Sequence, residues 1–363
     1  MAITSQTGVL SFGAQAHKTT VSTSFWKHRA TDVDLATISD DRLGPPEVGG
    51  SPIPTLPYRA GVVATGGATI NPRLEDSFGW LLMGAMGDEA HTSTEDALDS
   101  TSVTGTFVHH EFTFKTNDES FVPWMSFRKE IPAVVETTHH GETYVDCKIV
   151  GLTFALPNDG LINARVDVLG RMANGTQFES DPNWSYANSA YEDFSSVPIG
   201  CTVGGFLKIP TFSGTALPIA ACTITLTNAP LDIRQERVYG SPYLEDVTII
   251  GRALTVDMVV KWTDPNLYRS ILTGSTTATQ WSSKPYIEDL DVYALSPDHT
   301  PHSSSPYQLR VTAAQVMYQV VGGIRLAGNN AVMMRVQGTA IANTSNYCVI
   351  HLGNEIASYI WPT

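Results

Sequence analysis

Two histidine pairs, in the segments FVHHEF (107–112) and TTHHGET (137–143), are the residues of this 363-residue chain whose types are closest to metal ligands. Neighbouring side chains of a β-strand point to opposite faces, so His109 and His110 cannot reach the same ion. Neither pair has the i, i+4 spacing that puts two ligands on one face of a helix. A composite site, with one histidine from each pair and a carboxylate, stays open as an alternative. The pattern favours solvated histidines at strand ends, and we expect no metal and no other cofactor.

The cysteines and the remaining polar residues give no sign of catalysis. The chain has no GxSxG nucleophile elbow, no glycine loop for phosphate and no dinucleotide fingerprint. The cysteines lack the CxxC spacing of a zinc ribbon or a redox pair, so we expect buried free thiols. They are Cys147, Cys201, Cys222 and Cys348. The sequence therefore predicts no catalytic residues and a protein that is not an enzyme.

The charge balance excludes a groove that binds nucleic acid by neutralising phosphates. The chain has 36 acidic residues against 22 basic residues, a formal net charge of -14. Walls that repel DNA would instead suit a conduit through which DNA slides. The sequence has no run of about 20 apolar residues, so we expect no membrane span. No secretory signal is visible, so we expect the protein to be assembled where it is made.

The elements that must position these residues are predominantly β-strands. Runs rich in β-branched residues, such as CTITLTN (222–228) and VTIIGRALTVDMVVKW (247–262), are separated by Pro, Gly and Asn. The sequence therefore predicts an all-β protein with short helices.

One short helix is predicted from Asp76 to Met86, in the segment DSFGWLLMGAMGD. Apolar residues recur there at helical spacing, Asp76 or Ser77 can cap the start, and Gly87 can end the helix. Such a helix would cover one open end of a β-sandwich. We predict that its packing face consists of Leu74, Phe78, Leu81, Leu82 and Ala85.

The second half of the chain repeats the order of the first. A hairpin-like segment at 145–170 is echoed at 318–340, and the predicted helix is echoed by DPNLYRSILTG (264–274), with a β-rich run before each helix. The offset is about 190 residues at the helices and about 170 at the hairpins. We therefore predict a duplicated β-sandwich in which each half has one flanking helix. That the halves share only composition stays open as an alternative.

This repeat sets the expected domain boundaries. The first sandwich would span 1–175, a polar linker 176–196, and the second sandwich 197–363. We expect long loops at 30–57 and 88–105 in the first sandwich. Five prolines between 45 and 57 argue against regular structure in the former, and loops of such length are usually binding elements.

Alternation divides the second strand of each hairpin into an apolar face and a polar face. Apolar residues alternate with polar ones along 162–168 and again along 332–337, and the two polar faces correspond in position. We expect an isolated arginine among acids to be paired, with Asp167 or with a carboxylate of a neighbouring chain in the case of Arg165. The polar residues concerned are Asn163, Arg165, Asp167, Arg335 and Gln337.

Several segments, in their order along the chain, resemble one family of virus proteins. The segments GWLLMGAMG, HHEFTF, ESFVPWMSFRKE and YVDCKIVGLTFALPNDGLINARVDVLGR resemble the major tail tube proteins of long-tailed, siphovirus-like bacteriophages. The resemblance covers residues 58–171 well and the second half more loosely. It implies a structural protein of the virion tail and no enzyme.

The resemblance also implies an assembly. Family members share a β-sandwich flanked by a helix, and their subunits form stacked rings around an inner β-barrel through which DNA passes without specific binding. The implied partners are further copies of the chain, the tape measure protein and the tail terminator, in a tail assembled in the host cytoplasm. If both halves occupy ring positions, three chains give a pseudo-hexameric ring, which we favour. If the second half is a decoration domain, six chains are needed.

In such a barrel the polar faces at 163–167 and 335–337 would line the channel, and we expect the lining to carry a net negative charge. The alternative is that these are ordinary surface residues of a monomeric sandwich. Two other functions stay open. One is a carbohydrate-binding β-sandwich, acting in virion adsorption or decoration, with the aromatic residues of DPNWSYANSAYEDF (181–194) as its contact surface. The other is a metal-dependent hydrolase that uses the histidine pairs.

Overall fold

The computed structural model describes most of the chain. The described residues are 8–45, 48–50, 53, 56–74, 77–92, 107–115, 118, 121–131, 139–172, 177–180, 182, 184–187, 206–208, 217–296, 307–324, 331–342 and 347–362.

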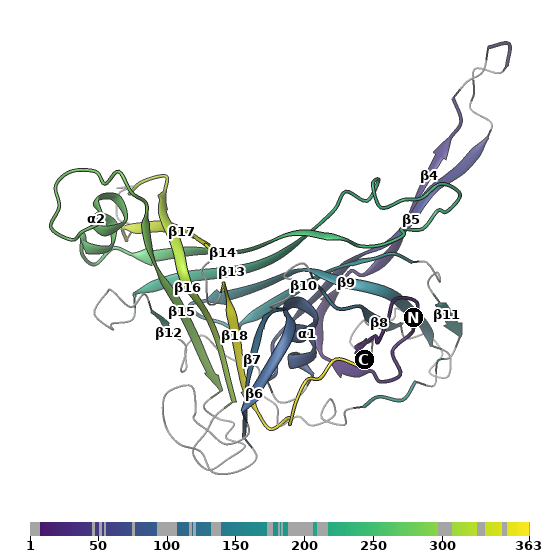
Figure 1. The fold of residues 1–363 in the computed structure, drawn as a ribbon, viewed down its shortest axis with the longest axis horizontal. Helices are drawn as coiled ribbons and strands as arrows, with labels where there is room; N and C mark the ends of the chain where they lie inside the picture. The colour runs from purple at the N-terminus through teal and green to yellow at the C-terminus, as the bar shows by residue number, and fades with distance from the viewer. Residues whose placement is uncertain are drawn as a thin grey trace.

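Eighteen β-strands and two short helices form within these residues, and the strands hydrogen-bond into one large sheet with antiparallel pairings (Figure 1). The expected mostly-β fold with short helices is confirmed. The helices are α1 (Phe78–Met86) and α2 (Asn266–Thr273). The strands up to residue 180 are β1 (Val9–Ala14), β2 (Trp26–His28), β3 (Ala30–Val33), β4 (Ala36–Leu43), β5 (Pro57–Ile70), β6 (Gly87–Thr92), β7 (Val108–Phe114), β8 (Met125–Ile131), β9 (His140–Pro157), β10 (Asn163–Gly170) and β11 (Gln177–Ser180). The later strands are β12 (Phe206–Lys208), β13 (Ile219–Pro230), β14 (Ile249–Lys261), β15 (Tyr286–Ser296), β16 (Tyr307–Val321), β17 (Met333–Ala340) and β18 (Val349–Asn354).

A continuous run of seven strands crosses the sheet in the order β5, β10, β9, β13, β14, β17, β16. The step from β9 to β13 crosses the predicted linker and pairs seven residues of each strand, from Pro157 opposite Ala221 to Gly151 opposite Thr227. A second crossing pairs β7 with β18. The two predicted sandwiches therefore share one sheet, and one main hydrophobic core contains residues of both.

The two ends of this run have the same strand order. β4 and β5 form a hairpin, α1 follows, and the β9–β10 hairpin returns with β10 beside β5. β13 and β14 form a hairpin, α2 follows, and the β16–β17 hairpin returns with β17 beside β14. Arg165 lies opposite Thr69 and Arg335 lies opposite Val259, so the paired positions keep the sequence offsets of about 170 and about 190 residues.

Helix α1 lies inside the core. It ends at Gly87, whose φ of 101° is readily adopted by glycine, as predicted. It begins at Phe78, Ser77 makes no side-chain capping bond, and Asp76 lies outside the described residues. The residues predicted for its packing face are all at most 2% exposed: Leu74, Phe78, Leu81, Leu82 and Ala85.

The other side of α1 is also covered by protein. An amphipathic helix with one packing face, as predicted from the sequence, would leave that side exposed. Only Trp80 of the helix is half-buried, and its ring packs edge-on against Tyr359 from the C-terminal segment. Gly79 permits this approach, since a Cβ there would lie 2.1 Å from the Tyr359 ring. The helix is thus enclosed by chain from both ends of the sequence, and it does not simply cap an open sandwich.

Helix α2 is the more exposed of the two. It lies within the predicted segment 264–274, ends at Gly274 with φ 75°, and buries only Leu267, Ser270 and Ile271. Its contacts are with β15 and β16. In Figure 1 it lies at the opposite end of the molecule from the β4–β5 hairpin, which projects as an arm.

The prediction of two long loops, at 30–57 and 88–105, is partly wrong. Residues 30–33 form β3 and residues 36–43 form β4, and both strands pair with β5. Residues 88–92 belong to β6, which pairs with β7. The prolines that suggested irregular structure all lie between 45 and 57, so they do not interrupt β4. Residues 93–105 of the second loop lie outside the described part of the chain. No described helix is long and apolar enough to cross a membrane.

Candidate functional site

The polar residues predicted on β10 and β17 lie on one face of the seven-strand run. Residues directly opposite each other in an antiparallel pair share a face of the sheet. From Arg165 such pairs lead across four further strands through Thr153, Thr225, Thr255 and Thr339. A row of threonine hydroxyls therefore connects the strand of Arg165 to the strand of Arg335.

A second row connects the same strands. It runs from Asn163 through Ala155, Thr223 and Asp257 to Gln337. Asp167 and Arg335 lie two residues from Arg165 and Gln337, so they share the face. We call this surface the polar face; it is defined by Asn163, Arg165, Asp167, Thr153, Thr223, Thr225, Thr255, Asp257, Arg335, Gln337 and Thr339.

The alternate residues of the same strands face the core, and the predicted alternation is confirmed on both β10 and β17. Ala164, Val166, Met334 and Val336 are at most 3% exposed. One face of the sheet therefore packs on the core and the other is polar, which is the pattern of a sheet with solvent on one side.

The second-half part of the polar face forms an open groove of about 630 Å³. Its lining contains threonines, Gln319, Arg335, Gln337 and Asp257, together with Ala221 and Val259. These groups offer hydroxyls and amides, and the two charged side chains neutralise each other. The groove therefore suits a tightly bound small ligand poorly.

Arg165 is held by two carboxylates. Its Nη2 donates to both carboxylate oxygens of Asp34, at 2.9 and 2.7 Å, and its Nε donates to Asp167 at 2.9 Å. The expected pairing with Asp167 is present. The Arg165 guanidinium lowers the pKa of Asp34, and the hydrogen bond to Asp34 raises the pKa of Arg165.

Arg335 is held by a carboxylate from the neighbouring strand. Its Nε donates to both oxygens of Asp257, at 2.9 and 3.0 Å, and Gln337 Nε2 donates to the same carboxylate at 3.0 Å. The hydrogen bond from Arg335 lowers the pKa of Asp257. The two clusters together hold three carboxylates and two guanidinium groups, so neither leaves a cation free to bind phosphate.

Asp34 and Asp257 are functional candidates that sequence reasoning missed. Asp34 lies between β3 and β4, in a stretch expected to be a loop, and its carboxylate also accepts the N–H of Gly67 at 2.7 Å. The position of Asp257 could have been predicted from the sequence. The segments CTITLTN and LTVDMVV alternate polar and apolar residues as 163–167 does, which places Asp257 on a polar strand face. The threonines of the polar face carry the same signal.

The first histidine pair divides between the two faces of β7, as the strand geometry predicted. His110 is fully buried, with Nδ1 2.6 Å from Glu89 Oε1 and Nε2 3.1 Å from Asn354 Oδ1. His109 lies on the other face with Glu111 and contacts His351 of β18, a histidine outside both predicted pairs. Burial lowers the pKa of His351 to about 3 and lowers that of His109.

The two histidines of the second pair lie beside different glutamates. His139 Nδ1 lies 2.9 Å from Glu130, and His140 Nε2 lies 3.4 Å from Glu142. In the described part of the chain these residues belong to no cluster of three possible metal ligands. The composite site with one histidine from each pair is therefore not formed there.

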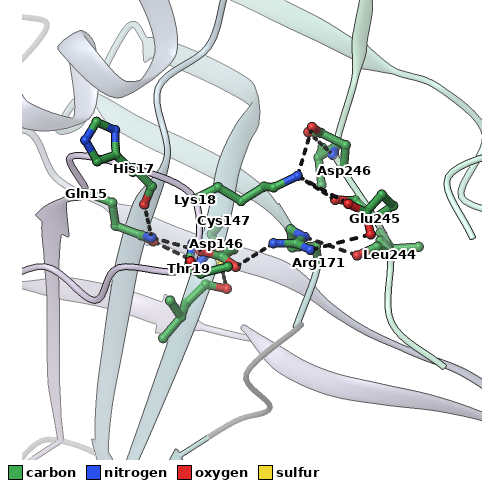
Figure 2. Close-up of polar contacts among 12 residues, drawn as sticks. Gln15, His17, Lys18, Thr19, Asp146, Cys147, Arg171, Leu244, Glu245 and Asp246 are labelled. Carbon is green, nitrogen blue, oxygen red and sulfur yellow. Dashed lines mark hydrogen bonds and ion pairs between the residues drawn. The ribbon is translucent and has the colours of Figure 1, made fainter. Parts of the chain in front are cut away.

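A buried ionic network links the N-terminal segment to both halves (Figure 2). Asp146, on β9, is fully buried and accepts hydrogen bonds from Gln15 Nε2 at 2.9 Å, the Thr19 N–H at 2.6 Å and Arg171 Nη1 at 3.2 Å. Arg171 Nε also donates to the carbonyl of Leu244 at 3.1 Å. These hydrogen bonds join the N-terminal segment, β9 and the segment at Leu244 to one another.

The expectation of buried free thiols is confirmed for the three cysteines that the structure describes. Cys147, Cys222 and Cys348 are buried free thiols, and burial raises the pKa of Cys147 and Cys348 above the ordinary thiol value. Cys201 lies outside the described residues.

Comparison with protein families gives one match. A family model described as phage tail tube protein matches residues 5–285, which is more than three-quarters of the chain. No curated protein matches the sequence significantly.

Proposed function

Because the chain belongs to the phage tail tube protein family, and is therefore a structural, non-enzymatic component of the virion tail, we propose that it is the major tail tube subunit and that its polar face lines the channel. The observation that carries the proposal is the single polar face that continues across β9 and β13, from the unit of β4, β5, β10 and β9 to the unit of β13, β14, β17 and β16. A wall of a tube must be continuous, and this face is continuous within one chain.

The proposed ring closes by repeating the internal contact between chains. Within the chain, β13 adds to the edge of β9 beyond β8. The corresponding edge at the end of β16, from Gln319 to Val321, pairs on one side with β17 and has no second strand partner among the described residues. β4, which corresponds to β13, pairs only with β5 in the described structure. The end of β16 would therefore accept β4 of the next chain.

This contact is head-to-tail, so its repetition forms a ring if the rotation closes. Each chain supplies two units of the same strand order, β4-β5-β10-β9 and β13-β14-β17-β16. Three chains would then give six units around the channel, which favours the trimeric pseudo-hexameric ring over the hexameric one. The duplication itself is part of this proposal, and the matching strand order and offsets support it.

The electrostatics of the polar face suit the passage of DNA. Each arginine in the two clusters is bound by at least one carboxylate, and the carboxylates outnumber the guanidinium groups. Phosphate contacts by free Lys and Arg are what hold DNA in a groove. A wall without such free cations would let DNA slide during ejection, without specific binding.

The β4–β5 arm would contact an adjacent ring. It projects from the molecule in Figure 1 and exposes apolar side chains that a monomer gains nothing by exposing. Ile38 is 52% exposed, Leu43 62% and Tyr58 51%. Stacking of rings would cover them, and contacts to the tape measure protein and the tail terminator would follow at the channel and at the tube end.

The runner-up function, carbohydrate binding, has less support. The described aromatic residues of 181–194 are Trp184 and Tyr186, and both are half-buried beneath cations. Arg128 lies over the Trp184 ring at 4.7 Å and Lys27 over the Tyr186 ring at 4.2 Å. A sugar platform needs open ring faces, and a cation covers one face of each of these two rings.

Electron microscopy of the purified protein tests the proposal. We expect rings or tubes with a central hole, three chains per ring, and the polar face on the inner wall. Six chains per ring would overturn the trimeric arrangement, and the polar face on the outside would overturn the channel assignment. A monomer that binds a glycan on an array would favour the runner-up function.

A pair of variants tests the proposed β4 edge. Successive residues of an antiparallel strand direct their N–H groups to opposite edges, so of Thr37→Pro and Ile38→Pro one removes a bond to β5 and the other removes an N–H from the outer edge. We expect the outer-edge variant to remain folded and fail to form rings. Rings from a folded outer-edge variant would count against the β16–β4 contact.

A further inference from the structure

Three side chains of metal-ligand type, from distant parts of the sequence, meet where β7 pairs with β18. His109 and Glu111 are alternate residues of β7 and share one face of that strand. His351 of β18 lies directly opposite Glu111 in the sheet. The adjacent residues His110 on β7 and Ile350 on β18 are buried on the other face, so the three side chains lie on the more solvent-exposed side of the sheet.

The distances among the three ligand atoms suit a single metal ion. His109 Nε2 lies 3.1 Å from His351 Nδ1, and Glu111 Oε1 lies 3.7 Å from the same nitrogen. All three atoms lie within 4.8 Å of one another. A tetrahedral zinc ion with bonds of about 2.1 Å holds its ligand atoms about 3.4 Å apart. Two of the separations are therefore already near the required value, and the half-exposed Glu111 side chain can move to adjust the third.

The second nitrogen of His351 is held by a neighbouring strand. Its Nε2 lies 3.2 Å from Thr312 Oγ1, and that hydroxyl donates to the carbonyl of Val349 at 3.4 Å. Since the hydroxyl proton is used in that bond, the imidazole Nε2–H donates to the hydroxyl oxygen. The lone pair of Nδ1 then points toward His109 and Glu111. Metal-binding histidines are commonly oriented by such a bond at their other nitrogen.

Without an ion, the contact between Glu111 and His351 Nδ1 has no proton to share. His109 Nε2–H can donate to His351 Nδ1, but the carboxylate of Glu111 then faces the same nitrogen, which carries no proton to offer it. An ion accepts electron pairs from all three groups at once. The nearby Arg310, opposite His351 on β16, is neutralised by Asp291 through bonds of 2.6 and 2.8 Å.

We propose that His109, Glu111 and His351 form a binding site for a divalent transition-metal ion of the zinc type. On binding, His109 releases the proton from Nε2 and carries one on Nδ1. The three protein ligands leave a fourth position for water or for a side chain of another copy of the chain. The site joins β7 of the first half to β18 near the C-terminus, so the ion would stabilise the contact between the two halves. It does not depend on the proposed channel.

Metal titration of the tag-free chain tests the site. After chelator treatment and dialysis, Zn²⁺ is added in a calorimeter, Co²⁺ is followed by its visible absorption, and thermal unfolding is recorded with and without one equivalent of Zn²⁺. We expect one ion per chain, the absorption of tetrahedral cobalt, and a rise in melting temperature that Mg²⁺ does not produce. Absence of stoichiometric binding by the folded wild-type chain overturns the proposal.

Variants assign the ligands. His351→Ala and His109→Ala should abolish binding, Glu111→Gln should weaken it at least tenfold, and Thr312→Val should weaken it about 10- to 100-fold through the orientation of His351. His140→Ala is the matched control, since His140 is also a strand histidine beside a glutamate, and it should bind as the wild type does. If a histidine variant fails to fold, the exposed Glu111→Gln still decides. Unchanged affinity in folded Glu111→Gln and His351→Ala proteins would contradict the assignment.

Discussion

The unit of β4, β5, β9 and β10 and the unit of β13, β14, β16 and β17 have the same strand order, but they are buried to different extents. In the first, α1 is enclosed on nearly all sides and β9 carries the buried Asp146–Arg171 pair. In the second, α2 buries three residues and leaves one side to solvent. Strand order is therefore separable from stability. The first unit is more deeply buried because segments outside the shared strand order cover it. These are the N-terminal segment at Gln15 and the C-terminal segment at Tyr359.

The largest expected effect of this difference is at Asp146. Asp146→Ala removes the nearer of the two carboxylates that pair with Arg171 in the described structure, at 3.2 Å, and leaves the exposed Glu245 at 4.0 Å. Loss of the buried partner of a buried guanidinium costs about 3 to 5 kcal/mol. Urea unfolding of the unassembled chain measures this loss.

The control for Asp146 is Asp257→Ala in the second unit. It also deprives an arginine of its carboxylate, but Arg335 is half exposed, so the loss should stay under about 1 kcal/mol. Equal losses in the two variants would show that the buried network adds nothing to the first unit.

The two helices should differ in the same direction. Leu82→Ala in α1 leaves a cavity in a fully packed region and should cost about 2 to 5 kcal/mol. Ile271→Ala in α2 should cost less than Leu82→Ala, because the open side of that helix lets the site collapse. Thermal unfolding of both variants checks the order, and a larger loss from Ile271→Ala would reverse the comparison.

Residues whose environment is local could be predicted from the sequence, and residues whose environment is distant could not. The alternation on β10 and β17 and the glycine stop of α1 each depend on a few neighbouring residues, and these predictions hold. The partners of Arg165 and His109, namely Asp34 and His351, depend on the register of strands far apart in the chain. The burial of α1 on its second side depends on Tyr359, more than 270 residues away.

Acid should weaken the first unit before the second, through His28. This side chain is fully enclosed beside α1, with Nδ1 2.6 Å from Ser77 Oγ, and burial lowers its pKa to about 4. The unfolded chain binds a proton at His28 below about pH 6.5, whereas the folded chain does so only near pH 4. The contribution of His28 to the free energy of unfolding is therefore fully present above about pH 6.5. It falls by about 3 kcal/mol as the pH drops to about 4.

His28→Asn isolates this contribution. The variant keeps a polar atom near Ser77 but cannot titrate, so the slope of unfolding free energy between about pH 6.5 and about pH 4 should become shallower. The carboxylates of Asp34 and Asp257, whose pKa values are lowered by their arginines, lose their contribution only as the pH falls below about 4. An unchanged slope in the variant would assign the acid sensitivity to other groups.

The smallest expected difference concerns the two arginines of the polar face. Arg165→Gln leaves Asp34 and Asp167 close together without a cation, whereas Arg335→Gln leaves a single carboxylate that still accepts from Gln337. Both sites are partly exposed, so the change at Arg165 should cost no more than about 1 kcal/mol, and the change at Arg335 should cost less. Adding Asp167→Asn to Arg165→Gln should recover part of the loss, because it removes one of the two repelling charges, and a double-mutant cycle measures that coupling. A coupling of zero would mean that the two carboxylates are screened from each other by solvent. In that case the cluster around Arg165 would contribute only its net charge to the polar face, as the pair around Arg335 does.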